Sequence, residues 1–360
     1  MNAFRESALS RTLFLRLIEN RWSKSLERVL RDSPPGGVLL ADPLPRSLAN
    51  SRDFIKKIHH ACAGSIFIAI REEGGTCDPL ARYFPGLPSP RAAAARGEKA
   101  VEKLGDLTGT ALKLLGVNAN FAPVLDLSTP LSEKMLVTRA FGCDPHHVAE
   151  CGRAFMRGLA RHKVLACGKH FPGWGSVPFE KGSALPVSAK PMAALWNEDL
   201  IPFRSLLPKL PMVLVSSAAY KAYDFELPRP ACLSSFVIDG LLREKLGYRG
   251  LAIGFGLEQK AVHGTLGFAE AVVQAVNAGC NMVIVDQGAG FSSALKALEV
   301  SAASGRLASR LASEALARVR AAQKRIPTSG PKASPKALAR LRDEFQKFSD
   351  SFGSGAPGNV

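Results

Sequence analysis

The sequence predicts an α/β fold, and within that class a (β/α)8 TIM-like barrel whose first or last strand is irregular. Short apolar runs alternate with longer amphipathic segments over about 250 residues. The short runs are apolar nearly throughout, which is typical of parallel strands covered by helices on the outside of the sheet. A doubly wound open sheet is the alternative, but no G-x-G-x-x-G turn follows the first run.

Seven strands are predicted, each from a short apolar run bounded by Gly, Pro or polar residues. They occupy residues 36–42, 65–70, 117–127, 163–171, 211–217, 250–256 and 281–287. A parallel barrel of this kind has eight strands, so one more is expected. We expect it to be irregular or to lie near the N-terminus.

Helices are predicted between the strands, where apolar residues recur at helical spacing. They occupy residues 47–61, 91–115, 144–161, 191–207, 234–246, 268–279, 291–304 and 307–325. One of them has a clear start signal in the sequence. Asp144 is a suitable N-cap, and Pro145 then stands at the first helical position, where its missing N–H costs nothing.

The two ends of the chain are predicted to differ from the barrel. Residues 1–22 carry scattered charges and no small-residue cleavage site, so we expect an ordinary helix, no secretory signal and a cytoplasmic protein. No apolar run reaches the ~18–20 residues that a membrane span needs. Residues 1–326 are expected to form a single barrel domain. Residues 327–360 are expected to form a Pro-, Ser- and Gly-rich basic tail with one short helix.

The composition argues against several other classes of protein. The seven cysteines are odd in number and form no C-x-x-C pair, which argues against a disulfide framework and a zinc site. We expect no metal and no cofactor. The net charge of +16 can attract nucleic acid non-specifically, but an arginine-rich surface explains it equally well. Because no nucleic-acid recognition signature is present, neither nucleic acid nor a membrane is expected as a partner.

Five motifs carry a resemblance to a known family. They read "NFAPVLDL", "TRAFGCDP", "ACGKHFPGWG", "GYRGLAI" and "AGCNMVIV", in that order along the chain. Together they resemble the N-terminal barrel domain of glycoside hydrolase family 3, over roughly residues 36–300. The most similar subgroup is the single-domain β-N-acetylglucosaminidases of peptidoglycan recycling. The resemblance implies a TIM barrel that acts on the glycosidic bonds of N-acetylglucosamine-containing glycans.

The resemblance also implies a set of sugar-binding residues at the carboxyl ends of the strands. Arg139 of "TRAFG" matches a sugar-binding arginine. Lys169 and His170 match a pair that binds hydroxyls of the non-reducing-end sugar. Asp126 of "PVLD" and Asp224 of "YDFELPRP" match two further family aspartates.

The residues expected to do the chemistry are different in this chain. Phe255 stands where the family has its nucleophile, and Gly182 stands where the subgroup has its proton-donor histidine. Arg71 replaces an acidic sugar-holding group, Trp174 replaces the second histidine of the K-H-F-P-G-H-G motif, and Ser217 replaces another histidine. Phenylalanine cannot form a covalent glycosyl intermediate, and retaining hydrolysis needs a nucleophile and an acid/base group together.

Four glutamates bear on this interpretation. Glu258 and Glu180 are candidates for relocated catalytic carboxylates, although a helix start and a surface loop explain them as well. Glu72 and Glu73 end the second predicted strand and point toward the barrel mouth. At least one of these two is expected to be structural and to accept backbone N–H groups near Gly74.

Other positions also allow two interpretations. Trp174 suits stacking on a sugar ring, and it equally suits a hydrophobic plug formed together with Phe255. Arg71, if it faces the pocket, favours an anionic ligand such as a carboxylated or phosphorylated sugar. Lys169 and His170 suit either contact with a sugar or anion, or structural bonds between loops at the barrel rim.

Three functional hypotheses follow. The first is a catalytically inactive glycosidase-like barrel that binds a glycan fragment or a protein partner. The second is an active O-glycosyl hydrolase that uses relocated carboxylates, Glu258 or Glu180. The third is a structural or interaction protein whose pocket is closed by Trp174 and Phe255. The first is preferred, because three replacements together indicate relaxed selection on hydrolysis, whereas one alone would not.

Overall fold

Eight parallel strands of the described residues close into a barrel, in the order β1-β10-β9-β7-β5-β4-β3-β2. The computed structural model describes residues 6–62, 64–178, 184–327 and 334–353. The barrel strands are β1 (Leu13–Arg16), β2 (Gly37–Leu39), β3 (Phe67–Ile70), β4 (Ala119–Asn120), β5 (Leu165–Phe171), β7 (Met212–Val215), β9 (Leu251–Gly254) and β10 (Met282–Asp286). The predicted (β/α)8 barrel is confirmed.

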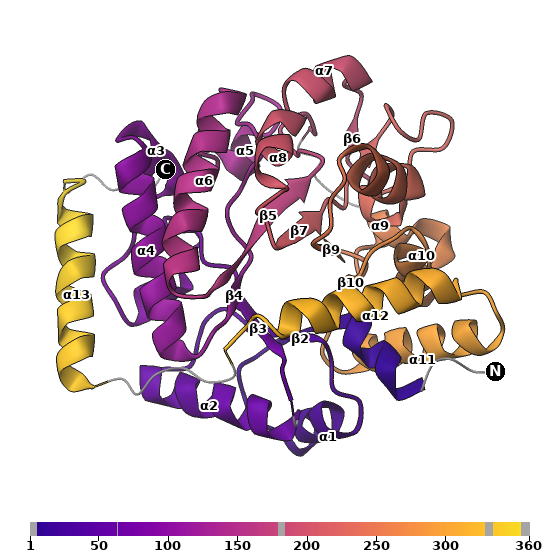
Figure 1. Ribbon diagram of the computed structural model, residues 1–360, viewed down its shortest axis with the longest axis horizontal. Helices are drawn as coiled ribbons and strands as arrows, with labels where there is room; N and C mark the ends of the chain where they lie inside the picture. Colours follow the sequence, from indigo (N-terminus) through magenta and orange to yellow (C-terminus); the bar gives the residue numbers. More distant parts are fainter. Residues whose placement is uncertain (1–5, 63, 179–183, 328–333, 354–360) are drawn as a thin grey trace.

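Helices surround the barrel (Figure 1). They are α1 (Lys24–Asp32), α2 (Leu48–Ala61), α3 (Pro90–Ala95), α4 (Glu98–Leu115), α5 (Glu133–Leu136), α6 (Pro145–Arg161), α7 (Met192–Asn197), α8 (Leu200–Leu206), the π-helix η4 (Phe236–Lys245), α9 (Lys260–His263), α10 (Phe268–Asn277), α11 (Ala289–Ala303), α12 (Ser309–Gln323) and α13 (Pro335–Asp350). A separate two-stranded ribbon pairs β6 (Val187–Ser188) with β8 (Ala219–Tyr220). No helix among the described residues is long and apolar enough to cross a membrane.

The eighth strand lies near the N-terminus, one of the two places where it was expected. The expectation of an ordinary helix at this end is wrong: a short 3-10 helix, η1 (Glu6–Thr12), leads into β1. The run Leu13–Leu15 explains the difference, since Phe14 packs inside the barrel while its two neighbours pack against the surrounding helices. Because β1 pairs with both β10 and β2, it closes the barrel.

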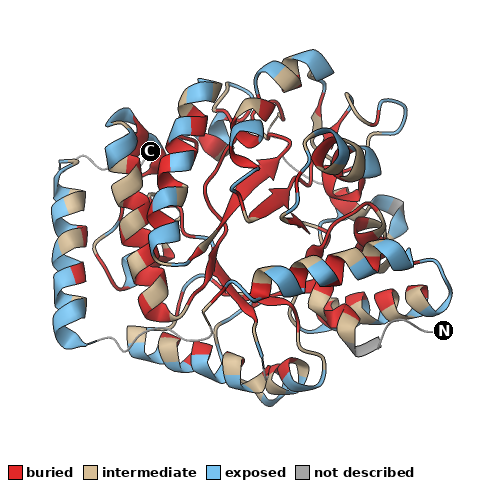
Figure 2. Ribbon diagram, in the orientation of Figure 1, coloured by how far each residue is buried: buried red, intermediate tan, exposed pale blue. Residues whose placement is uncertain are grey.

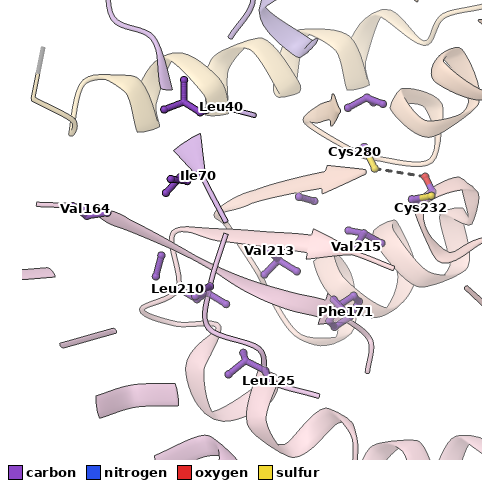
Figure 3. Packing of buried hydrophobic residues seen from close by; sticks show 14 of the residues in the cluster. Leu40, Ile70, Leu125, Val164, Phe171, Leu210, Val213, Val215, Cys232 and Cys280 are labelled. Atoms are coloured by element: carbon purple, nitrogen blue, oxygen red, sulfur yellow. Dashed lines mark hydrogen bonds between the residues drawn. The ribbon is translucent and has the colours of Figure 1, made fainter. Parts of the chain in front are cut away.

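Alternating side chains divide the hydrophobic core into two layers. Inside the barrel lie Phe14, Phe67, Phe121, Leu214 and Ile253, and the next residue along each strand faces the helices. In Figure 3, Val213 and Val215 of β7 belong to this outer layer, together with Phe171 of β5. Figure 2 shows the strands buried and the outer helix faces exposed. Apolar residues on both sides of each strand explain why the runs are apolar throughout.

Two predicted elements differ in extent from the structure. The predicted strand 117–127 is reduced to β4, because Pro123 has no N–H to donate to a neighbouring strand. The predicted helix 91–115 divides into α3 and α4 at Gly97, whose φ of 88° is unfavourable for other residues. The helix start at Asp144 is confirmed, since its side chain accepts a hydrogen bond from the His147 backbone N–H.

The helix expected in the C-terminal tail is α13, and it packs along the outside of α4 (Figure 1). Phe345 is completely buried and stacks on Phe84, with ring centroids 4.7 Å apart. Lys103 of α4 forms an ion pair with Glu344 at 3.0 Å. The division of the chain into residues 1–326 and 327–360 stays a prediction, but α13 contributes a buried contact to the barrel.

Replacing Phe345 with alanine is expected to lower the free energy of unfolding by about 3 kcal/mol, because a buried aromatic contact is lost and a cavity remains. Urea unfolding followed by circular dichroism measures the change. Arg340→Ala on the same helix is the matched control, since that side chain is 83% exposed and should change stability by less than about 0.5 kcal/mol. Equal urea midpoints for the two variants would contradict a contribution of α13 to the stability of the fold.

Candidate functional site

A cavity of about 650 Å³ opens at the carboxyl ends of the barrel strands. Residues that end or follow seven of the eight strands line it. They are Arg16 at the end of β1, Asp42 after β2, Arg71 after β3, Phe121 after β4, Lys169 and His170 within β5, Ser217 after β7, and Phe255 and Glu258 after β9. Arg139 and Trp174 contribute from longer loops. In parallel barrels this end carries the functional residues, so the cavity is the candidate ligand site.

A buried ion triad forms the floor of the cavity on one side. Glu73 accepts two hydrogen bonds from Arg139, at 2.7 Å from Nε and 2.8 Å from Nη2. The same carboxylate accepts a hydrogen bond from the Lys169 ammonium, which also donates to the carbonyl of Phe121. Lys169 and Glu73 are each 1% exposed, so this charge cluster lies almost entirely out of water.

The triad contains two cations and one carboxylate. Burial raises the pKa of Glu73, but Lys169 and Arg139 outweigh it and lower that pKa to about 2. Burial lowers the pKa of Lys169, and Glu73 opposes that change. For Arg139, the bond to Glu73 outweighs burial and raises the pKa. Glu73 is therefore a structural carboxylate that keeps two cationic groups at the edge of the cavity.

A second buried carboxylate holds the imidazole of His170. Asp126 accepts hydrogen bonds from the His170 backbone N–H at 2.9 Å, from His170 Nδ1 at 2.7 Å and from the Trp174 backbone N–H at 2.8 Å. Burial lowers the pKa of His170, although Asp126 opposes this, so the neutral ring is favoured. When Nδ1–H donates its hydrogen bond to Asp126, Nε2 of the neutral ring is left as an acceptor for a ligand hydroxyl.

Two aromatic rings flank this histidine. The Trp174 ring lies 5.5 Å from the His170 ring, and the Phe255 ring lies 5.7 Å from it, measured between centroids. Both aromatic side chains are partly exposed and line the cavity. Phe255 directly follows β9, whose pairing of Gly254 with Val215 and Val283 fixes its place at the strand end.

Glu258 is partly buried on the opposite side of the barrel from the triad. Its Oε1 accepts a hydrogen bond from the Asp286 backbone N–H at 2.7 Å. Burial raises the pKa of Glu258, and the nearby Asp286 carboxylate acts in the same direction. Asp286 itself pairs with Arg16. The side chain lines the cavity and lies two residues before α9, so Glu258 is near a helix start as expected, and its role stays a prediction.

Glu72 is the structural glutamate that the sequence predicts beside Gly74. Its two carboxylate oxygens accept backbone N–H groups of Gly74 at 2.8 Å and of Leu80 at 3.1 Å. Gly74 has a φ of 87°, and a Cβ there would lie 2.5 Å from the Pro88 carbonyl oxygen, so only glycine fits. Burial raises the pKa of Glu72 well above its ordinary value. This carboxyl shapes the loop after β3 and does not line the cavity.

The structure does not bring all of the predicted site residues together. Arg71, Arg139, Lys169, His170 and Trp174 line the cavity. Asp126 lies behind His170, fully buried, so it can position the imidazole but cannot touch a ligand in this arrangement. Asp224 does not line the cavity; it is buried elsewhere and accepts a hydrogen bond from the Ser234 hydroxyl. Glu180 and Gly182 lie outside the described residues.

Sequence reasoning missed Arg16 and Asp42 as cavity residues. Arg16 was overlooked because the N-terminal stretch was interpreted as a helix. The available signal was "LFLR", a short apolar run that ends in a charged residue, as β10 ends in Asp286, but four residues are too few to distinguish a strand from a helix. Asp42 follows β2 and was included in the predicted strand 36–42 without a role.

A closed parallel barrel with a polar cavity at the carboxyl ends of its strands defines the class: this is a TIM-barrel protein with its site in the usual place. Residues 12–322 match the family described as "Glycosyl hydrolase family 3 N terminal domain". The chain belongs to this family, and the resemblance stated from the sequence is confirmed.

Curated relatives agree with this assignment. A Beta-hexosaminidase of Thioalkalivibrio sulfidiphilus is 30% identical over 266 residues, which are 72% of this chain and 75% of the relative. A Beta-hexosaminidase of Alkalilimnicola ehrlichii is 32% identical over 277 residues, 74% of this chain and 78% of the relative. The similarity therefore extends over most of the barrel in both comparisons.

Solved structures give the same result. A glycoside hydrolase family 3 β-N-acetylglucosaminidase from Paenibacillus sp. str. FPU-7 superposes with a TM-score of 0.86 at 26% identity, covering 96% of this chain and 68% of that chain. The β-N-acetylglucosaminidase from Thermotoga maritima superposes with a TM-score of 0.79 at 27% identity, covering 93% of this chain and 70% of that one. These structures and the curated relatives support a β-hexosaminidase-like glycosidase scaffold.

Replacing Glu73 with glutamine is expected to lower the free energy of unfolding by about 3–5 kcal/mol, because Lys169 and Arg139 are left as buried cations without an anion. Chemical denaturation measures this. Adding Lys169→Met to Glu73→Gln should recover part of the loss, since one unpaired charge is removed. Glu270→Gln is the control, because its partner Arg306 is a surface residue. A loss as small as that of the control would contradict the structural role of Glu73.

The pH dependence of stability is expected to carry the signature of Glu73. Its pKa in the folded chain, about 2, lies below the ordinary value of 4.5. The ionised group therefore stabilises the fold above pH 4.5, and this contribution is lost as the pH falls toward 2. Urea midpoints measured at pH 5, 4 and 3 should fall more steeply for the wild type than for Glu73→Gln. Parallel curves would show that Glu73 is not the group responsible.

Proposed function

We propose that this chain is a β-N-acetylhexosaminidase-like barrel that binds an N-acetylglucosamine-containing glycan and has lost the ability to hydrolyse it. In this view the protein serves cell-wall glycan metabolism as a sugar-binding pseudoenzyme. Its cavity keeps the groups that hold a sugar, whereas the positions expected to carry out the reaction hold other residues. A protein partner in addition to the glycan is part of the same proposal.

The observation that carries this proposal is the residue that follows β9. The resemblance puts a nucleophilic carboxylate at this strand end, and the side chain that lines the cavity there is Phe255. A phenyl ring has no lone pair to attack an anomeric carbon. Loss of one member of a catalytic pair lowers kcat by about 10⁴- to 10⁶-fold in the best-studied hydrolases. The proposal therefore does not depend on the loop that contains Gly182.

The remaining groups suit sugar binding. A neutral His170 offers an acceptor, while Lys169 and Arg139 offer N–H donors beyond those that Glu73 and nearby carbonyls accept. Trp174 presents a partly exposed ring at the same edge of the cavity. Donors, an acceptor and an aromatic face together suit a polyhydroxylated ring. The relatives are Beta-hexosaminidases and β-N-acetylglucosaminidases, which supports an N-acetylglucosamine-containing ligand.

An active O-glycosyl hydrolase with relocated carboxylates is the second candidate function. Glu258 favours it, because this carboxyl lines the cavity and burial raises its pKa, as is usual for a general acid. The other carboxylate among the described cavity residues is Asp42, on the far side of β1 and β10 from Glu258. The hydrogen bond from the Asp286 backbone N–H gives Glu258 a structural role that does not require catalysis. Glu180, the other candidate, lies outside the described residues.

We further propose a cytoplasmic location and a role in peptidoglycan recycling. The seven cysteines are all free thiols, and five of them are buried, which suits a reducing compartment. This part of the proposal is testable by fractionation of cells that produce the tagged protein. Recovery of the protein in the secreted or envelope fraction would contradict it.

Purified protein is expected to bind N-acetylglucosamine or its β-1,4-linked dimer saturably in calorimetry. The same protein should release no chromophore from p-nitrophenyl N-acetyl-β-glucosaminide above the uncatalysed rate. Trp174→Ala should weaken binding about 10-fold, because stacking is lost.

The other outcomes separate the hypotheses. Turnover that Glu258→Gln abolishes would establish the active hydrolase with a relocated carboxylate. Absence of any saturable sugar binding would reject a glycan site and favour an interaction protein.

A further inference from the structure

The charges around the cavity are unevenly distributed. Arg71, Arg139 and Lys169 come from β3, from the loop after β4 and from β5, which are neighbouring strands. Within the described part of the chain, Glu73 is the one carboxylate that pairs with any of these cations. The β3–β5 side of the cavity therefore carries three cationic groups and one ionised carboxylate among the described residues.

Arg71 is the cation on this side that pairs with none of the described residues. It directly follows β3, its side chain is exposed and lines the cavity, and it forms no ion pair with a described residue. Arg71 also lies close enough to Lys169 to act against the positive charge of that ammonium. An exposed guanidinium next to a buried, net-positive triad is a strong attractor for an anion.

The opposite side of the cavity, formed by β1, β10 and β9, has no such excess of positive charge among the described residues. Arg16 of β1 pairs with Asp286 of β10, with Nη2 2.8 Å from Oδ2, so these two charges compensate each other. Glu258, after β9, adds a carboxyl group. A ligand with one negatively charged substituent would therefore have a defined orientation, with the charged group toward β3–β5. A neutral sugar would leave Arg71 without a partner.

Resting on the proposed function that this cavity binds a sugar, we propose that the ligand is an anionic sugar whose carboxylate or phosphate group is bound by Arg71. The planar guanidinium can donate two parallel N–H bonds to either group. Lys169 contributes through its third N–H, since the described residues accept the other two. A hydroxyl at the same place has one acceptor oxygen and no negative charge, so it would neither accept two parallel bonds nor neutralise the guanidinium.

Asp42 provides a matched control. It is also an exposed side chain at the cavity, one strand away from Arg71, and it carries the opposite charge. Neither side chain is part of the buried core, so Arg71→Gln and Asp42→Asn should both fold like the wild type. If the electrostatic field of the cavity selects the ligand, Arg71→Gln must weaken the binding of anions and Asp42→Asn must strengthen it.

The experiment is calorimetric titration of the full chain with four probes: N-acetylglucosamine, N-acetylglucosamine 6-phosphate, N-acetylmuramic acid and inorganic phosphate. At least one anionic sugar is expected to bind about 10- to 100-fold more tightly than N-acetylglucosamine, as charge-assisted bonds imply. Arg71→Gln should remove this preference, so that anionic and neutral sugars bind with similar affinities. Asp42→Asn should increase the preference. Raising the salt concentration should reduce the preference.

The results distinguish a failure of the anionic-ligand proposal from a failure of the proposed sugar-binding function. Equal affinity for neutral and anionic sugars, or a preference that survives Arg71→Gln, would overturn the anionic-ligand proposal while sugar binding stands. Inorganic phosphate binding as tightly as the sugar phosphate would overturn it as well, because the sugar would then contribute nothing. Binding of none of the sugars would overturn both. Comparison of the phosphate and carboxylate sugars identifies which charged group the site accepts.

Discussion

The arrangement of the cavity depends on one buried carboxylate. Glu73 stands just after β3 and draws together Arg139 from the loop after β4 and Lys169 from β5. Three consecutive strands are thus joined at their carboxyl ends by a single ionised side chain. Burying these charges has a large desolvation cost, which is offset only because each partner is hydrogen-bonded with good geometry. The cationic edge of the cavity exists because this cluster is intact.

Two further buried carboxyls hold parts of the same region in place by accepting hydrogen bonds. Glu72 accepts two backbone N–H groups and sets the path of the loop after β3, while Asp126 fixes both the His170 ring and the Trp174 backbone. Each is fully buried and makes at least two hydrogen bonds. A neutral apolar replacement at any of these positions would leave buried N–H groups unpaired and would therefore lower the free energy of unfolding.

These carboxyls differ from the side chains that only face the cavity, because the fold itself depends on them. Carboxyls that hold loops or cations are required for folding, whether or not a bond is cleaved. Phe255 at the end of β9 is partly exposed in the cavity and packs against His170 and the inner core, and its ring holds no loop or cation by hydrogen bonds.

The sequence by itself determined the barrel, because apolar runs that are buried on both faces are specific to parallel strands and need no long-range information. It also determined the family, and it indicated Arg71, Lys169, His170 and Phe255 as residues of one strand-end region. It could not identify the eighth strand: "LFLR" is too short to be distinguished from a helix until β2 and β10 pair with it.

Only the tertiary structure decided which polar residues face the ligand. Asp126 and Asp224 stand in motifs as clear as that of Lys169, yet one lies behind His170 and the other lies away from the cavity. The sequence predicts which residues lie at the end of a strand. It does not predict which buried groups their side chains contact, because those groups come from neighbouring strands that are distant in the sequence. The pairing of Glu73 with two cations, and hence the unbalanced charge near Arg71, arises only when β3, β4 and β5 lie side by side.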